Sequence, residues 1–291
     1  MKQVFLVILL AFGFVVGAQN KIVKKPKKQK PATTQVAPKK HKSQSKPTKG
    51  GTVKCVATKA SYSNGTLTVN GIKYNMVWVD GGTFRMGATS EQGSEISDEK
   101  PVHSVTLSGY YIGKTEVTQA LWQAVMGSNP SYFEGDDLPV EQVSWDDCQE
   151  FIRKLNSLTG QNFRLPTEAE WEFACRGGNN SRGYKYSGSN YIDNVAWYDG
   201  NSGDKTHPVA TKSPNELGIY DMSGNVWEWC ADWYGDYSSG RQTNPKGPYD
   251  GSHRVFRGGS WNSIAWFCRS SFRYNFIPTD RISFLGLRLA L

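Results

Sequence analysis

Acidic residues are missing from the first 50 positions of this 291-residue chain. The stretch from residue 19 to residue 50 holds eleven lysines and no aspartate or glutamate, and proline, glutamine, serine and threonine fill much of the rest. Such a segment buries too little apolar surface to offset its chain entropy, which excludes a packed core there. We interpret residues 19–50 as a disordered lysine-rich linker, and contact with an anionic surface is its alternative role.

This lack of acids also explains the charge of the whole chain. The net charge is +8, from 34 basic and 26 acidic residues, and residues 1–50 contain 12 of the basic ones, all lysine. The remaining 241 residues therefore carry 22 basic and 26 acidic side chains, a net charge of −4. This sign disfavours nucleic-acid binding by the domain, so we expect no nucleic-acid partner.

The N-terminus has the pattern of a targeting segment. A single lysine, Lys2, precedes an apolar run from Val4 to Val16, and small residues follow up to Ala18. This pattern predicts a secretory signal peptide over residues 1–18, with an uncleaved anchor as the alternative. No cysteine follows the apolar run, which disfavours lipid attachment there. We expect an exported protein of the periplasm, the cell surface or the extracellular space.

Histidine and cysteine are scarce. The four histidines have no metal-ligand or catalytic-triad spacing, so we expect them to be structural or at the surface. Five cysteines in an exported chain allow two disulfides and leave one thiol over. Ten tryptophans, 14 tyrosines and 30 glycines indicate much irregular backbone held by aromatic anchors. Residues 51–75 are interpreted as a short β-rich lead-in to a single large domain.

Hydrophobic periodicity predicts strands first and helices next. Strands are expected over 65–69, 74–79 and 102–112, with Asn-Gly turns between the early ones. Two capping boxes, Ser144 with Asp147 and Thr167 with Glu170, mark helix starts. The expected helices are 115–126, 144–158 and 167–173, and no helix is expected beyond Cys175.

Several motifs follow one another in the order of a known family. They are GGTFRMG at 81–87, TEVT at 115–118, PV at 139–140, VSW at 143–145, RLPTEAEWE at 164–172, GNVWEW at 224–229 and RGGSW at 257–261. Together, from about residue 76 to 291, they resemble the formylglycine-generating-enzyme, or sulfatase-modifying-factor, family. The resemblance implies an α+β, C-type-lectin-like fold with a small mixed sheet, two to three helices and extensive ordered loops.

Oxidases of this family convert a sulfatase cysteine to formylglycine with a Cu(I) ion bound by two cysteines. By direct counting the matching positions here are Ser263 and Cys268. In an alternative alignment Cys268 belongs to a structural segment downstream, and both thiolates are absent. One soft ligand cannot hold linear Cu(I), so we expect no copper and no oxidase activity. Formylglycine generation stays the enzymatic alternative.

The resemblance also implies calcium and disulfide bonds. The first calcium site would use two carboxylates and two backbone carbonyls, which are hard oxygen ligands; the alternative is turn and cap hydrogen bonding. A second site matches the family less well. The number of cysteines that remain, with Cys55 unpaired, suggests a further disulfide. The implied residues are Asp221, Gly224, Val226 and Glu228 for the first site, Asn194, Val195, Asn201 and Gly203 for the second, and the pairs Cys175–Cys268 and Cys148–Cys230.

The run from 262 to 291 contains no lysine, glutamate, glutamine or methionine. Many residues in it can be reached from an asparagine codon by changing the first two bases, although Trp266 cannot. The run resembles the variable region of diversity-generating-retroelement proteins. Rings with short polar groups suit a binding surface, and ordinary core is the alternative. The predicted ligand-binding residues are Asn262, Ser263, Ile264, Trp266, Phe272, Tyr274, Asn275, Phe276, Thr279, Asp280, Ile282 and Ser283.

The sequence thus favours a non-catalytic protein that binds a protein or a glycan through its C-terminal loops, with or without retroelement diversification. Rigid loops held by disulfides and calcium would keep the entropy cost of binding low. A structural component of a cell-envelope complex, docked by the lysine-rich segment, is a further alternative.

Overall fold

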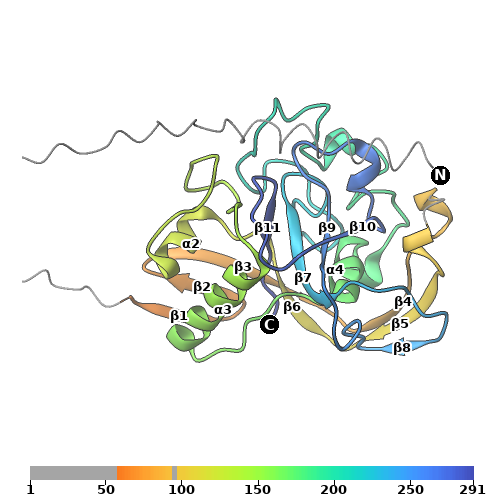
Figure 1. Ribbon diagram of the computed structural model, residues 1–291, viewed down its shortest axis with the longest axis horizontal. Coiled ribbons are helices and arrows are strands. Elements are labelled where there is room, and N and C mark those ends of the chain that lie inside the picture. The colour runs from red at the N-terminus through yellow and green to blue at the C-terminus, as the bar shows by residue number, and fades with distance from the viewer. Residues whose placement is uncertain (1–57, 94–96) are drawn as a thin grey trace, which may run out of the picture. The chain divides into compact units, whose positions relative to one another are not determined.

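Three small sheets and three α-helices form the part of the chain that the computed structural model describes, residues 58–93 and 97–291 (Figure 1). The predicted signal peptide, the lysine-rich linker and Cys55 lie outside these residues. In the described part, no helix has the length and apolar character needed to cross a bilayer.

The first sheet has the order β1-β2-β3-β6. It consists of β1 (Ala60–Ser63), β2 (Thr66–Val69), β3 (Ile72–Val79) and β6 (Tyr110–Gly113), all antiparallel. The two Asn-Gly turns adopt positive φ angles, as tight hairpins require. This confirms the two early predicted strands. Because β3 pairs with both β2 and β6, the lead-in and the domain share this sheet.

The second sheet lies at the centre of Figure 1 and has the order β10-β9-β7-β11. Its strands are β7 (Trp227–Trp233), β9 (Arg254–Arg257), β10 (Arg273–Phe276) and β11 (Leu285–Leu287), and β11 runs parallel to β7. The third sheet contains β4 (Gly82–Met86), β5 (His103–Leu107) and β8 (Gln242–Thr243). The predicted strand 102–112 is therefore two strands in different sheets, separated at Ser108 and Gly109.

Both capping boxes form as predicted. Ser144 caps α3 (Trp145–Thr159), and Thr167 caps α4 (Glu168–Cys175). The first helix is shorter than predicted: α2 spans Gln119–Met126, capped by Thr118. The preceding residues are drawn into backbone pairing instead, because the Val117 amide donates to the Leu287 carbonyl at 2.9 Å. Beyond Cys175 the described chain has no α-helix, as expected, and its helical segments are three short 3-10 turns: η3 (Gly178–Asn180), η4 (Ile192–Asn194) and η5 (Ala265–Cys268). Two further 3-10 turns, η1 (Ser90–Gln92) and η2 (Ser97–Glu99), precede β5.

The disulfide predictions are wrong for the described residues, where Cys148, Cys175, Cys230 and Cys268 are all free and buried. Cys175 packs in the main core, and its thiol donates to the Met222 carbonyl at 3.6 Å. Cys268 belongs to a separate small cluster. Cys175 and Cys268 therefore lie in different clusters, which neither the family pattern nor the number of cysteines could indicate.

Candidate functional site

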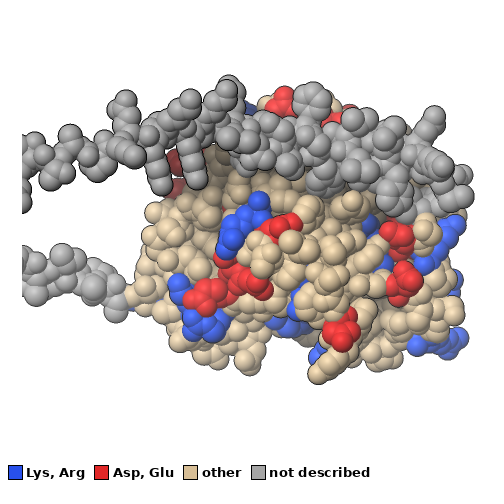
Figure 2. Space-filling view, viewed as in Figure 1, with Lys and Arg blue, Asp and Glu red and all other residues tan. Residues whose placement is uncertain are grey.

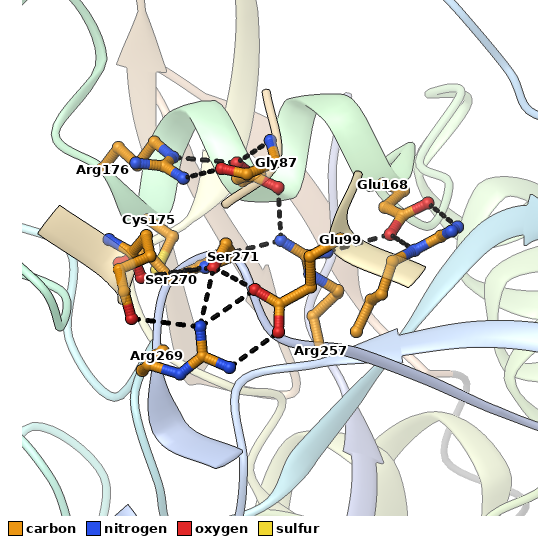
Figure 3. A network of polar contacts seen from close by, with 12 residues as sticks. Gly87, Glu99, Glu168, Cys175, Arg176, Arg257, Arg269, Ser270 and Ser271 are labelled. Carbon is orange, nitrogen blue, oxygen red and sulfur yellow. Dashed lines mark hydrogen bonds and ion pairs between the residues drawn. The ribbon is translucent and has the colours of Figure 1, made fainter. Parts of the chain in front are cut away.

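Buried ion pairs fix the C-terminal run in place. The Arg269 guanidinium contacts both oxygens of Glu99 at 2.9 and 2.6 Å, and both side chains are almost fully buried (Figure 3). The Ser271 hydroxyl also donates to Glu99. Arg269 further donates to the carbonyls of Trp266 and Gln92. Through this pair, the segment around η5 is attached to the loop before β5, some 170 residues earlier.

A second set of pairs links α4 to strands β9 and β10. Arg257 donates to Glu168 at 2.9 Å and to Glu172 at 2.6 Å. Arg273 makes a bidentate pair with Glu168, both bonds at 2.7 Å. Arg176, at the end of α4, bonds the other Glu172 oxygen at 2.8 Å. These guanidinium groups do the anchoring that the sequence had suggested for disulfides.

Glu228 is fully engaged by protein groups. Arg288 donates to both of its oxygens at distances from 2.7 to 3.1 Å, and the Trp171 indole donates at 2.6 Å. All three side chains are buried. Because the carboxylate is neutralised and saturated here, Glu228 does not fit the role of a calcium ligand that was predicted for it.

Another carboxyl, missed in the sequence, stands beside Asp221. Glu116 is completely buried, and neither of its oxygens has a hydrogen-bond partner among the described residues. Burial, and then the nearby Asp221 carboxyl, raise the pKa of Glu116 well above its usual range. Asp221 is also buried, and one of its oxygens accepts the Ala210 amide at 2.7 Å. The only signal for Glu116 in the sequence was its place in the TEVT motif.

Orphaned buried oxygens of this kind fit a hard cation. Glu116 and Asp221 would supply carboxylate oxygens, and Gly224 and Val226, on the buried loop after Asp221, would supply carbonyls. Within residues 58–93 and 97–291, no group of three or more His, Cys, Asp or Glu side chains could hold a metal. Carbonyls would therefore have to complete the ligand set.

The second predicted calcium loop is closed by its own hydrogen bonds. The Asn201 amide oxygen accepts the Tyr198 amide at 3.0 Å, and its amino group donates to Asp193 and Ala196. The Asn194 carbonyl accepts the Ser213 amide at 2.9 Å. Asn194, Val195, Asn201 and Gly203 offer only uncharged carbonyl oxygens, so this loop fits calcium less well than the carboxyl pair of Glu116 and Asp221, and the second site stays a prediction.

The positions that match the copper cysteines by direct counting hold one thiol and one hydroxyl. The Ser263 hydroxyl is buried and bonds the Ser260 amide and hydroxyl at 3.0 and 2.9 Å. Cys268 is fully buried, and burial raises the pKa of its thiol far above the usual range. One hydroxyl and one thiol do not provide the pair of soft sulfur ligands that suits Cu(I).

The predicted ligand-binding residues divide by exposure. Ile264 and Thr279 are exposed, and Ser263 and Phe272 are buried. These last two are corrections: Ser263 locks a turn, and Phe272 packs on Phe267 with ring centroids 4.8 Å apart. The other eight are half-buried at the surface: Asn262, Trp266, Tyr274, Asn275, Phe276, Asp280, Ile282 and Ser283.

Two of the half-buried side chains, Tyr274 and Phe276, are partly covered because they pack on the core. Tyr274 and Phe276 lie on β10, and both rings contact the buried Phe256, at 5.6 and 6.2 Å between centroids. Each therefore serves both core and surface. The alternative interpretation of the run as ordinary core is right for Phe272 but not for Ile264, which is 43% exposed.

The structure adds an aromatic group that the sequence did not single out. The Trp261 indole donates to the Ser283 carbonyl at 3.0 Å and touches Phe133 edge-on at 5.4 Å. Phe133 in turn contacts Tyr132, which is 66% exposed. The loop between α2 and α3 thus borders the predicted binding run. On the face drawn in Figure 2, charges of both signs are interspersed over a mostly uncharged surface.

Comparisons with known proteins agree with this architecture. The model of the sulfatase-modifying factor enzyme 1-like domain matches residues 67–291. Chaperone protein LppX of Paenibacillus barcinonensis is 37% identical over 254 residues, covering 70% of this chain and 83% of that protein. The formylglycine-generating enzyme of Mus musculus is 30% identical over 285 residues, covering 74% of each chain. The solved structure of Treponema denticola variable protein 1 has a TM-score of 0.70 and 38% identity, covering 77% of this chain and 97% of that one.

Proposed function

Because the chain belongs to the sulfatase-modifying factor family, whose C-type-lectin-like fold it shares, we propose that it is an exported, non-catalytic member that binds a macromolecular ligand. The binding surface is the C-terminal run between Asn262 and Ser283. The observation that carries the proposal is the contrast at this run: exposed and half-exposed side chains stand on fully buried Arg–Glu pairs. A rigid support of this kind lowers the entropy cost of binding.

Two relatives support a binding role. One is named a chaperone protein and the other a variable protein. The chaperone favours a protein as ligand. The variable protein favours diversification of the run, in which side chains at the surface would vary while the buried Arg–Glu pairs stay unchanged. A glycan ligand and a structural role in the cell envelope are the other outcomes of the test below.

The enzymatic alternative has a direct test. Purified protein is incubated with Cu(I), oxygen and a cysteine peptide derived from a sulfatase, and the peptide is analysed by mass spectrometry. We expect no conversion of thiol to aldehyde, because Ser263 and Cys268 provide one sulfur ligand and not two. Aldehyde formation in proportion to protein would refute the proposal.

The binding surface is tested on a glycan array and a surface-displayed protein library. Any ligand that the wild-type protein captures should be lost in Ile264→Asp and Thr279→Arg, which change exposed side chains with little effect on folding. Tyr191→Ala, at a tyrosine that is 77% exposed outside the run, is the matched control. Capture that survives both surface variants would place the binding site elsewhere.

We further propose that calcium bound between Glu116 and Asp221 holds the loop that follows Asp221. When bound, the ion would supply the positive charge that these two buried carboxyl groups lack. Arg288 acts on both carboxyl groups only at a distance, because its ion pair is with Glu228.

A further inference from the structure

A cavity separate from the C-terminal run lies against α4, β7 and the segment from 235 to 248. Its volume is about 460 Å³, within the range of small-ligand pockets. None of the predicted ligand-binding residues lines it. Its walls include His103, Glu168, Asp232, Tyr237, Lys246 and Arg273.

Asp232 is the unusual group in this wall. It is 4% exposed, and one oxygen accepts the Glu168 amide at 2.9 Å. The other oxygen lies near Gly247, where an added β-carbon would come within 3.1 Å of it. Burial raises the pKa of Asp232 to about 7, and the Glu168 carboxylate adds to this effect. No guanidinium or ammonium forms an ion pair with Asp232 within the described part of the chain.

The charge balance of the surrounding network explains this isolation. The connected ion pairs involve three guanidinium groups, those of Arg176, Arg257 and Arg273, and three carboxylates, those of Glu91, Glu168 and Glu172. Each of these three positive charges is therefore already matched by a negative one, so none of them is left to pair with Asp232.

Arg254 approaches Asp232 without pairing to it. Its guanidinium lies between the rings of Trp145 and Trp233, at 3.8 and 3.4 Å, and donates to the Ala231 carbonyl. The titratable and charged side chains around Asp232 come from α4, β5, β7, β9, β10 and the 235–248 segment: Glu168, Glu170, His103, Cys230, Arg254, Arg273, Asp236, Tyr237 and Lys246.

We propose that this cavity binds an alkylammonium group, with Asp232 as its counter-ion. An ammonium carries one positive charge and three hydrogen-bond donors, which match a buried carboxylate that lacks a cation. The group could belong to a lysine side chain of a partner or to a free amine. This inference does not rest on the proposed role of the C-terminal run.

The test is a calorimetric titration of the full-length protein at pH 8 and pH 5.5. The probes are Nα-acetyl-lysine methylamide, butylamine, and Nα-acetyl-norleucine methylamide as the uncharged analogue. We expect the two amines to bind at pH 8, and about 30-fold more weakly at pH 5.5, since only the ionised fraction of Asp232 is competent. Tighter binding of the lysine amide than of butylamine would indicate a lysine side chain as the source.

The variant Asp232→Asn separates charge from folding. It keeps the shape and an oxygen that can accept the Glu168 amide, so it should fold and yet bind neither amine at either pH. Asp250→Asn, at an exposed position outside the cavity, is the control and should bind as the wild type does. Three results would each overturn the proposal: amine binding by Asp232→Asn equal to that of the wild type, binding of the norleucine analogue equal to that of the amines, and no binding of either amine at pH 8.

Discussion

Replacing Glu99 by glutamine tests whether buried ion pairs hold the C-terminal run. The Arg269 and Glu99 side chains are 0% and 1% exposed, and their closest atoms are 2.6 Å apart. Glutamine keeps the size of the side chain but removes its charge, and it turns an amide donor toward a guanidinium that has no acceptor sites. The Arg269 charge is then buried without compensation.

Removing one partner of a buried pair costs about 3–5 kcal/mol of unfolding free energy. In a protein of this size, that corresponds to a fall in Tm of about 10 °C. The Ser271 hydroxyl and Gln92 also bond within this cluster, so the cost should lie in the upper half of the range. A part of it should return in the double variant Glu99→Gln with Arg269→Met, because no charge is left unpaired there.

Urea unfolding followed by tryptophan fluorescence measures this loss. Glu150→Gln is the matched control, since Glu150 and Arg153 form a similarly short pair of 2.7 Å with exposed side chains. We expect no measurable change in the control. A loss below about 1 kcal/mol in Glu99→Gln would refute the reasoning, because the pair would then behave like one at the surface.

Two further predictions concern the other buried carboxyl groups. Calcium at 100 times its Kd should raise the Tm of the wild type by about 5–10 °C in differential scanning fluorimetry; an equal rise in Glu116→Gln, or none in the wild type, would exclude the proposed site. Because the pKa of Asp232 is raised, the unfolded chain ionises first and stability falls as pH rises from about 4 to 7. Asp232→Asn should therefore raise the free energy of unfolding more at pH 8 than at pH 4, by up to about 4 kcal/mol. Urea unfolding that shows no such difference between the two pH values would contradict this.

Local features of the fold were predictable. Both capping boxes form because a cap and its partner are three residues apart, so that the sequence contains the whole interaction. The Asn-Gly hairpins follow for the same reason. The start of α2 was predicted four residues early, because the Val117 amide pairs with Leu287, far away in the chain.

The site was less predictable. Glu228 was assigned to calcium, but Arg288, 60 residues later, takes both of its oxygens. Glu116 was overlooked because it meets Asp221 only when two distant loops come together. Ser263 and Phe272 were placed at the binding surface because composition does not distinguish a turn-locking hydroxyl or a packed ring from an exposed one.

The sequence by itself determined the family, the fold, the helix caps and the absence of a second cysteine at the copper positions, because each depends on residue identity or on short spacing. The tertiary structure alone decided which charges neutralise each other, which thiols stay apart and which carboxyl groups are left without a cation. The physical reason is that an interior of low dielectric makes each buried charge depend on partners that the chain supplies from 60 to 170 residues away.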